Sequence, residues 1–164
     1  MIWICRYQSP LGAVTMAAKK EALIGLWFDG QKYFGSTLTK DWEEKELPVF
    51  DTAKRWLDTY FKGANPDFMP PLDTGGTEFQ REVWEILKAI PYGKTITYGQ
   101  IGAKIAEKRG LSSMSAQAVG NAVGRNPISI LIPCHRVVGA SGSLTGYAGG
   151  IEKKRALLTL EKAI

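Results

Sequence analysis

A stretch rich in proline and glycine is the feature of this sequence that most limits how the chain can fold. Residues 63–76 contain three glycines and three prolines. Proline has no backbone N–H to donate, and glycine loses more conformational entropy on ordering than other residues. Helices and central strands therefore rarely continue through such a segment. We expect a linker here and two domains, residues 1–76 and 77–164, because 164 residues are enough for two small domains.

The first domain is predicted to be a small α/β unit. Its three expected strands cover residues 2–7, 13–17 and 22–28. A helix is expected around residues 50–61, where the large apolar side chains recur at helical spacing.

The second domain contains two strong signals for the start of a helix. Thr77 and Gln80 match a capping box, in which each side chain bonds the backbone amide of the other residue, and Thr97 and Gln100 match another. The first of these helices has to end near Pro91.

A third helix is predicted from Ser115 to about Val123, after Gly110 has ended the second. Two short helices around a brief turn are typical of a helix-turn-helix. The third helix is rich in small residues, namely Ser115, Ala116, Ala118, Gly120 and Ala122. Small side chains permit either tight packing against another helix or close approach to a nucleic-acid groove, and the spacing leaves both open.

Charge is distributed unevenly between the two halves. Residues 1–76 hold 9 basic and 10 acidic side chains, whereas residues 77–164 hold 12 and 6. The basic second half indicates either a polyanionic partner such as nucleic acid or a charge that serves solubility alone. Because no stretch approaches the roughly 20 apolar residues of a membrane span and no secretory leader is visible, we expect a soluble cytoplasmic protein.

The most reactive residue types follow a continuous apolar run. Residues 128–132 predict a buried strand, and Pro133, Cys134, His135 and Arg136 come next. A thiolate is the nucleophilic form of cysteine, and a neighbouring base or cation promotes it. Adjacent side chains of a strand point to opposite faces, so a contact between Cys134 and His135 needs a turn or a bridging water. A buried free cysteine beside an unrelated histidine is the alternative.

Other cysteine or metal chemistry is not expected. Cys5 has no comparable neighbours and is predicted to lie in the core. Two cysteines and one histidine are too few for a disulfide framework or a structural zinc site, so we expect no metal and no cofactor.

The segment Pro133-Cys134-His135-Arg136-Val137, with Asn126-Pro127 before it and Gly146-Tyr147 after it, resembles the active-site signature of the O6-alkylguanine-DNA alkyltransferases (methylated-DNA–protein-cysteine methyltransferases). Residues 79–99 are similar to the family's first two helices, and residues 147–161 to its C-terminal helix. The first half resembles the family only in size and layout. The resemblance implies a small ribonuclease-H-like N-terminal domain and a C-terminal winged helix-turn-helix-like domain that carries the chemistry.

The resemblance also implies a reaction. A damaged guanine is flipped out of double-stranded DNA, and its O6-alkyl group passes to a cysteine by direct displacement. The protein would act as a monomer, without a cofactor, and be consumed after one turnover; O4-alkylthymine is a further candidate substrate. The implied catalytic residues are Cys134 as nucleophile and alkyl acceptor, His135 as base through a water, Glu161 as the group that orients His135, Asn126 as a brace of the active-site turn, and Tyr98 as phosphate contact and proton donor. The implied pocket residues are Tyr147, Val137 and Ala148, and the implied DNA contacts are Gln117, Ser115, Ala116, Ala118, Gly120 and Arg125.

One position departs from the family pattern. Many members have an arginine near the start of the recognition helix, where it fills the gap left by the flipped base, and this chain has Gln117. Glutamine brings no charge, so base flipping or DNA affinity is expected to be weaker unless Arg125 compensates.

Three other functions fit parts of the sequence. A damage-binding module without transfer would lack a reactive acceptor, a thiol hydrolase would turn over repeatedly, and a winged-helix regulator would bind a specific DNA sequence and ignore lesions. The presence of Cys134 argues against the first, and the helix-turn-helix argues against the second.

Overall fold

The computed structural model describes all 164 residues, which form two units. The first unit comprises Met1–Gly75 together with Pro127–Leu131, and the second comprises Gly76–Asn126 and Ile132–Ile164. None of the helices is long and apolar enough to cross a membrane.

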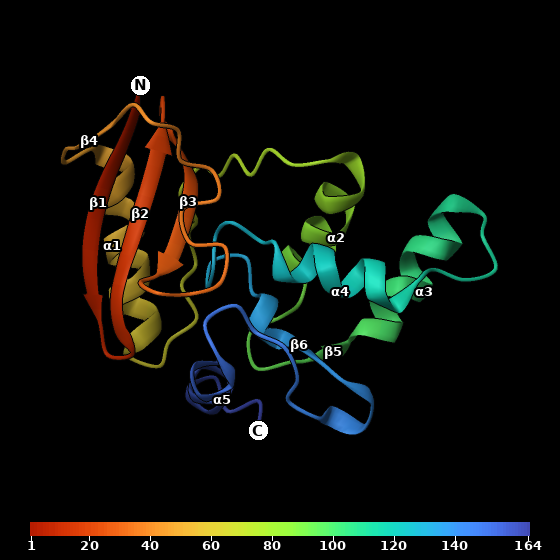
Figure 1. Ribbon diagram of the computed structural model, residues 1–164. Helices are drawn as coiled ribbons and strands as arrows, with labels where there is room; N and C mark the ends of the chain where they lie inside the picture. The colour runs from red at the N-terminus through yellow and green to blue at the C-terminus, as the bar shows by residue number, and fades with distance from the viewer. The chain divides into compact units, whose positions relative to one another are not determined.

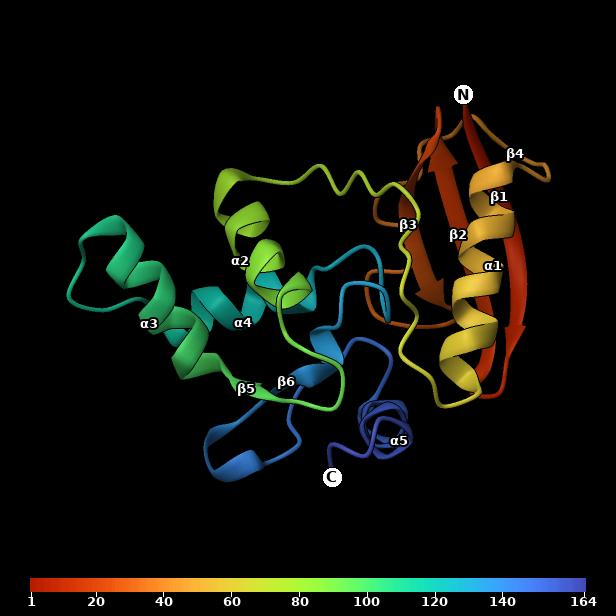
Figure 2. The same ribbon diagram turned by 180° about the vertical axis from the view of Figure 1, so that it is seen from behind.

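A four-stranded sheet with one helix forms the first unit (Figure 1). Its elements are β1 (Ile2–Ser9), β2 (Gly12–Lys19), β3 (Ala22–Phe28), β4 (Trp42–Glu44) and α1 (Pro48–Phe61). The strand order is β3-β2-β1-β4, with β1, β2 and β3 antiparallel and β4 parallel to β1. Figure 2 shows α1 lying across one face of the sheet. The three predicted strands and the helix are confirmed, and β4 was missed because its three residues are all exposed.

Strand β3 pairs with two segments that are distant in the sequence. The backbone of Leu23 exchanges hydrogen bonds of 2.9 and 2.8 Å with residues 71–73, and the backbone of Leu26 exchanges two of 2.9 Å with residues 127–129. Part of the expected linker is therefore ordered against the sheet. Residues 127–131 also belong to this unit.

The second unit is mainly helical. Its elements are α2 (Glu78–Lys88), β5 (Ile96–Thr97), α3 (Tyr98–Arg109), α4 (Ala116–Gly124), η1 (Cys134–Arg136), β6 (Val137–Val138), η2 (Ala140–Gly142) and α5 (Ile151–Leu160). Helices α2, α3 and α4 pack against one another, and β5 pairs with β6 in parallel. Both predicted capping boxes are present, and Gly110 ends α3 with φ 69° in the left-handed region. The predicted helix-turn-helix pair is thus α3 and α4.

The strand expected at residues 128–132 is wrong, because this run forms a buried turn. Only Ile128 makes a β-bridge, and the amide of Leu131 donates back to the carbonyl of Ser129 at 2.8 Å. Ile130 has φ 71°, a conformation that costs a residue with a side chain about 1–2 kcal/mol. All five residues are buried, so their hydrophobicity reflects their location and not a strand.

We predict that Trp84→Phe weakens the helical packing of the second unit. The indole N–H of Trp84 donates to the carbonyl of Ala122 in α4 at 2.8 Å, and the residue is 3% exposed. The variant loses this bond and leaves a small cavity, which should lower the free energy of unfolding by about 1–2 kcal/mol in chemical denaturation. Trp42→Phe is the matched control, since Trp42 is 42% exposed and should change stability by less than about 0.5 kcal/mol. An equal loss in both variants would contradict the prediction.

Candidate active site

Cys134 is presented by a tight turn. Pro133 has φ −81° and ψ 65°, and the amide of Cys134 donates to the carbonyl of Ile132 at 2.8 Å, as in an inverse γ-turn. Proline fixes φ, so the direction in which the backbone enters η1 is restricted. The side-chain amide of Asn126 donates to the same Ile132 carbonyl at 2.8 Å. The side chain of Asn126 and the amide of Cys134 therefore share one acceptor in this turn.

A single buried carboxylate gathers the groups around this turn. Oε2 of Glu161 lies 2.6 Å from Nε2 of His135, and Oε1 accepts from Nε of Arg136 at 2.8 Å. Oε1 also accepts the backbone N–H of Gly93 at 3.0 Å. Gly93 has φ 77°, and a Cβ there would lie 3.1 Å from the carbonyl oxygen of Glu161, so glycine suits this close approach. The side chains of His135 and Glu161 are both fully buried.

His135 is held in its neutral form. Burial lowers its pKa below the ordinary value, and the hydrogen bond and charge of Glu161 oppose this effect without overcoming it. The contact with Glu161 assigns the ring proton to Nε2, which leaves the lone pair on Nδ1. A proton accepted at Nδ1 would form an imidazolium already paired with a carboxylate. The arrangement therefore suits a general base.

The thiol of Cys134 is also held in its neutral form. The residue is 6% exposed, and burial raises the pKa of the thiol above its ordinary value. A hydrogen bond from Asn126 and the positive charge of Lys154 lower the pKa, but burial remains the largest influence. At neutral pH Cys134 is consequently a thiol, which would need a proton acceptor to become a nucleophile. His135, the next residue of η1, carries a neutral imidazole.

Aromatic side chains border this site. Tyr98 is the first residue of α3, and its hydroxyl donates to the carbonyls of Thr145 and Gly146 at 3.2 and 3.4 Å. The ring of Tyr147 meets that of His135 edge-on, with centroids 6.5 Å apart. The structure thus brings the predicted residues Tyr98 and Tyr147 to one loop beside the reactive turn.

The two other predicted pocket residues are placed differently. Val137 is fully buried, and its amide donates to the carbonyl of Cys134, so a contact with a base edge would have to use its own carbonyl. Ala148 is half-buried in the loop after Tyr147.

Helix α4 keeps one face free of internal packing. Ser115 caps it by accepting the amide of Ala118 at 3.2 Å, and Ala116 and Gln117 are exposed. A Cβ added at Gly120 would meet nothing within 4 Å. Tight internal packing therefore does not account for glycine at this position. The packed face consists of Val119, Ala122 and Val123, and Arg125 is exposed just after the helix.

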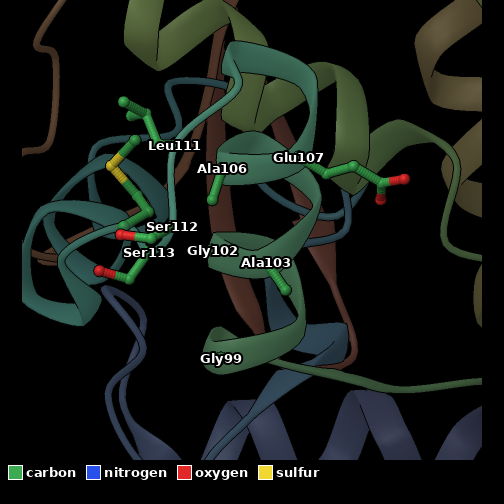
Figure 3. A pocket seen from close by; sticks show the side chains of 9 residues that line it. Gly99, Gly102, Ala103, Ala106, Glu107, Leu111, Ser112 and Ser113 are labelled. Atoms are coloured by element: carbon green, nitrogen blue, oxygen red, sulfur yellow. The ribbon is translucent and has the colours of Figure 1, made fainter.

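A hollow of about 500 Å³ lies between α3 and the segment that leads into α4 (Figure 3). Its lining residues are Gly99, Gly102, Ala103, Ala106, Glu107, Leu111, Ser112, Ser113 and Met114. Neither Cys134 nor His135 is among them, so this hollow is distinct from the reactive turn.

Three residues of the site were not assigned a role from the sequence. Arg136 bonds Glu161 and also donates from Nη1 to the carbonyl of Ile90 at 2.7 Å, and Gly93 bonds Glu161 through its amide. Lys154 is fully buried, although it stands in a run of exposed charges. The burial of Lys154 could have been predicted from the sequence, because Lys154 lies on the same face of the helix as Leu157, Leu158 and Glu161.

Two family models match this chain and together cover nearly all of it. Residues 5–74 match the ribonuclease-like domain of 6-O-methylguanine DNA methyltransferase, and residues 78–163 match its DNA binding domain. The chain belongs to this family. The expected family and the α/β fold class with a ribonuclease-like and a DNA-binding domain are therefore confirmed.

Individual relatives agree with this family. The methylated-DNA–protein-cysteine methyltransferase of Mycobacterium tuberculosis (strain H37Rv) is 44% identical over 163 residues, which are 99% of this chain and 94% of the relative. The solved structure of Mycobacterium tuberculosis O6-methylguanine methyltransferase matches with a TM-score of 0.83 and 44% identity, over 99% of this chain and 94% of that one. A structure of Mycobacterium tuberculosis OGT in complex with DNA matches with the same score and identity, over 98% and 93%.

We predict that Glu161→Gln destabilises the fold of this family member. The guanidinium of Arg136 is then left buried without its ion-pair partner, which should lower the free energy of unfolding by about 3–5 kcal/mol. Chemical denaturation followed by circular dichroism measures the loss. Glu152→Gln removes the same charge from an exposed position of α5 and should cost less than about 1 kcal/mol. If the two variants were equally stable, the carboxylate would not have the structural role described.

Proposed function

We propose that this protein repairs O6-alkylguanine in double-stranded DNA by moving the alkyl group to Sγ of Cys134. The observation that carries the proposal is the buried pair of His135 and Glu161, in which Nε2 and Oε2 are 2.6 Å apart. His135 directly follows Cys134, which is held in a tight turn. It is supported by the relatives named methylated-DNA–protein-cysteine methyltransferase and by the family of both domains.

The proposed chemistry starts from two neutral groups, the thiol of Cys134 and the imidazole of His135. Nδ1 of His135 takes the thiol proton of Cys134 through a water, and Glu161 stabilises the imidazolium that forms. The thiolate attacks the alkyl carbon while the bond from that carbon to O6 breaks, and the bonding electrons go to the guanine. The guanine then takes up a proton, for which the hydroxyl of Tyr98 is the proposed donor. The product is a thioether, which water does not readily cleave, so each molecule reacts once.

Helix α4 is the proposed DNA-reading element. Its exposed face carries small residues, so its backbone can approach a groove closely, and the target base is flipped out because its reacting atom is inaccessible inside the stack. The second half carries 12 basic and 6 acidic residues, so phosphate contacts should dominate affinity and weaken with salt. Ser115, Ala116, Gln117, Ala118, Gly120 and Arg125 are the proposed contacts.

Further properties follow from this chemistry. We propose that O4-alkylthymine is a second substrate, since it presents an alkyl–oxygen bond of the same kind. We propose a monomer of two domains, residues 1–76 and 77–164, because one copy supplies every proposed catalytic group. Its compartment would be the cytoplasm, where thiols stay reduced and Cys134 remains reactive.

We predict that Cys134 gains one methylene unit in mass. Intact-mass spectrometry after mixing the protein with a duplex that contains one O6-methylguanine should show an increase of about 14 Da, mapped to Cys134 by digestion. Cys134→Ser should show no increase, whereas Cys5→Ser should react normally, because Cys5 lies in the sheet of the first unit.

The extent of this reaction separates the alternatives. One equivalent per protein supports stoichiometric transfer, and repeated product formation would indicate a hydrolase. An unchanged mass with selective binding of the lesion would indicate a damage-binding module, and binding without selectivity a sequence-reading regulator.

We predict that Gln117→Arg strengthens DNA binding. The new charge at the exposed start of α4 should add about one phosphate contact and steepen the dependence of log K on log salt by about 0.9. Fluorescence anisotropy with a labelled duplex at several salt concentrations measures the slope. Gln8→Arg adds the same charge at an exposed position of β1 and is the control. If both variants steepened the slope equally, the position of residue 117 would have no special role.

A further inference from the structure

The guanidinium of Arg136 is held from three directions inside the second unit. Its Nε donates to Oε1 of Glu161 at 2.8 Å, and its Nη1 donates to the carbonyl of Ile90 at 2.7 Å. The guanidinium carbon also lies 5.7 Å from the ring centroid of Tyr92, within the range of a cation–π contact. A cation fixed in this way keeps its charge at one place beside the carboxylate.

The two oxygens of the Glu161 carboxylate have different partners. Oε1 accepts from the guanidinium of Arg136 and from the backbone N–H of Gly93, whereas Oε2 lies 2.6 Å from Nε2 of His135. The three side chains are buried, so water screens their charges little. The negative charge that faces the imidazole is therefore already compensated on its other oxygen.

The charges of these three side chains cancel only while the imidazole is neutral. Without the guanidinium of Arg136, the carboxylate of Glu161 would be a buried charge beside a neutral ring, and such a charge draws a proton. That proton can form the imidazolium. It can also reside on the carboxyl group, which then donates to Nε2 while the ring proton moves to Nδ1. Both arrangements put a proton on Nδ1 of His135.

The other ionisable groups near His135 do not replace Arg136. Burial is the main cause of the lowered pKa of His135, the charges of Arg136 and Lys154 also lower it, and Glu161 raises it. Nζ of Lys154 donates to the carbonyls of residues 145–146, so Arg136 is the cation bonded directly to the carboxylate that faces the ring. The remaining groups cannot carry a positive charge, and they are Cys134 in η1, Tyr92 after α2 and Tyr147 before α5.

We propose that Arg136 keeps Nδ1 of His135 able to accept a proton, by compensating the charge of Glu161 on the oxygen that His135 does not use. The carboxylate then bonds the ring without drawing a second proton onto it in the resting state. Arg136 is thus a positioning residue that acts through Glu161 and His135, and this inference rests on the proposed role of His135 as general base.

The first test is an NMR titration of His135, whose ring signals are unambiguous because it is the only histidine of the chain. The ¹⁵N shifts of the ring, recorded without DNA, report whether Nδ1 carries a proton. In the wild type Nδ1 should be unprotonated at pH 7. In Arg136→Gln, which keeps a donor and removes the charge, the apparent pKa of the His135–Glu161 pair should rise by at least about one unit. Arg136→Lys keeps a cation and should stay close to the wild type.

The second test is the pH dependence of single-turnover methyl transfer from DNA. Below pH 7, Arg136→Gln should react up to about tenfold more slowly, because Nδ1 is then already protonated. The deficit should shrink as the pH rises above the raised pKa and the base is restored. The dissociation constant for the duplex should not change. Arg155→Gln removes an equal charge from the exposed face of α5 and should match the wild type in both tests.

An unshifted titration in Arg136→Gln would overturn the inference, because a purely structural role would slow transfer at every pH without moving the titration of His135. Should Arg136→Gln fail to fold, as judged by circular dichroism, the wild type and Arg136→Lys decide. A wild type with a proton on Nδ1 at pH 7, or a pKa raised by one unit in Arg136→Lys, would also overturn the inference.

The titration separates this inference from the proposed function, because it needs no DNA. A wild type that takes up no methyl group would refute the proposed function. The coupling of Arg136 to His135 would still be judged by the ring signals alone.

Discussion

The carboxylate of Glu161 is the interaction on which the reactive part of this protein depends. It receives hydrogen bonds from the ring of His135, the guanidinium of Arg136 and the amide of Gly93. His135 and Arg136 are neighbours in η1, whereas Gly93 is distant from them in the sequence, and the carboxylate itself stands at the end of α5. One charged group therefore bonds the histidine and joins the C-terminal helix to the turn that carries Cys134.

Burial gives this site two neutral partners in place of an ion pair. Removal from water raises the pKa of the Cys134 thiol and lowers that of the His135 imidazole, so both stay uncharged at neutral pH. The buried carboxylate of Glu161 is then placed to stabilise the imidazolium that the proposed proton transfer creates. Such a thiol is protected from ordinary oxidants and electrophiles, because the thiolate is their target. Reactivity is thereby reserved for a substrate that enters the site.

Local features were predicted well from the sequence, whereas contacts between distant residues were not. The capping boxes at Thr77 and Thr97 and the stop at Gly110 depend on neighbouring residues, and the structure contains all three. The run at residues 128–132 was misread, because a buried turn and a buried strand need the same apolar residues and the positive φ of Ile130 leaves no trace in composition. The bond from Gly93 to Glu161 spans 68 positions and could be found only in the fold. The roles of the individual site residues in the reaction remain predictions.

Stability alone would not select the charges found in this small unit. Arg136, Glu161 and Lys154 are all buried. Removing their charges from water costs more free energy than burying apolar side chains of similar size in the same places. If the carboxylate only joined α5 to the turn of η1, it and its partner Arg136 could both be replaced by apolar side chains of similar size. Glu161 instead faces the imidazole of His135, the group that gains a positive charge in the proposed reaction. In that reaction the carboxylate is best compensated after His135 has accepted a proton, which makes the energetic cost in the resting state a gain at the moment of reaction.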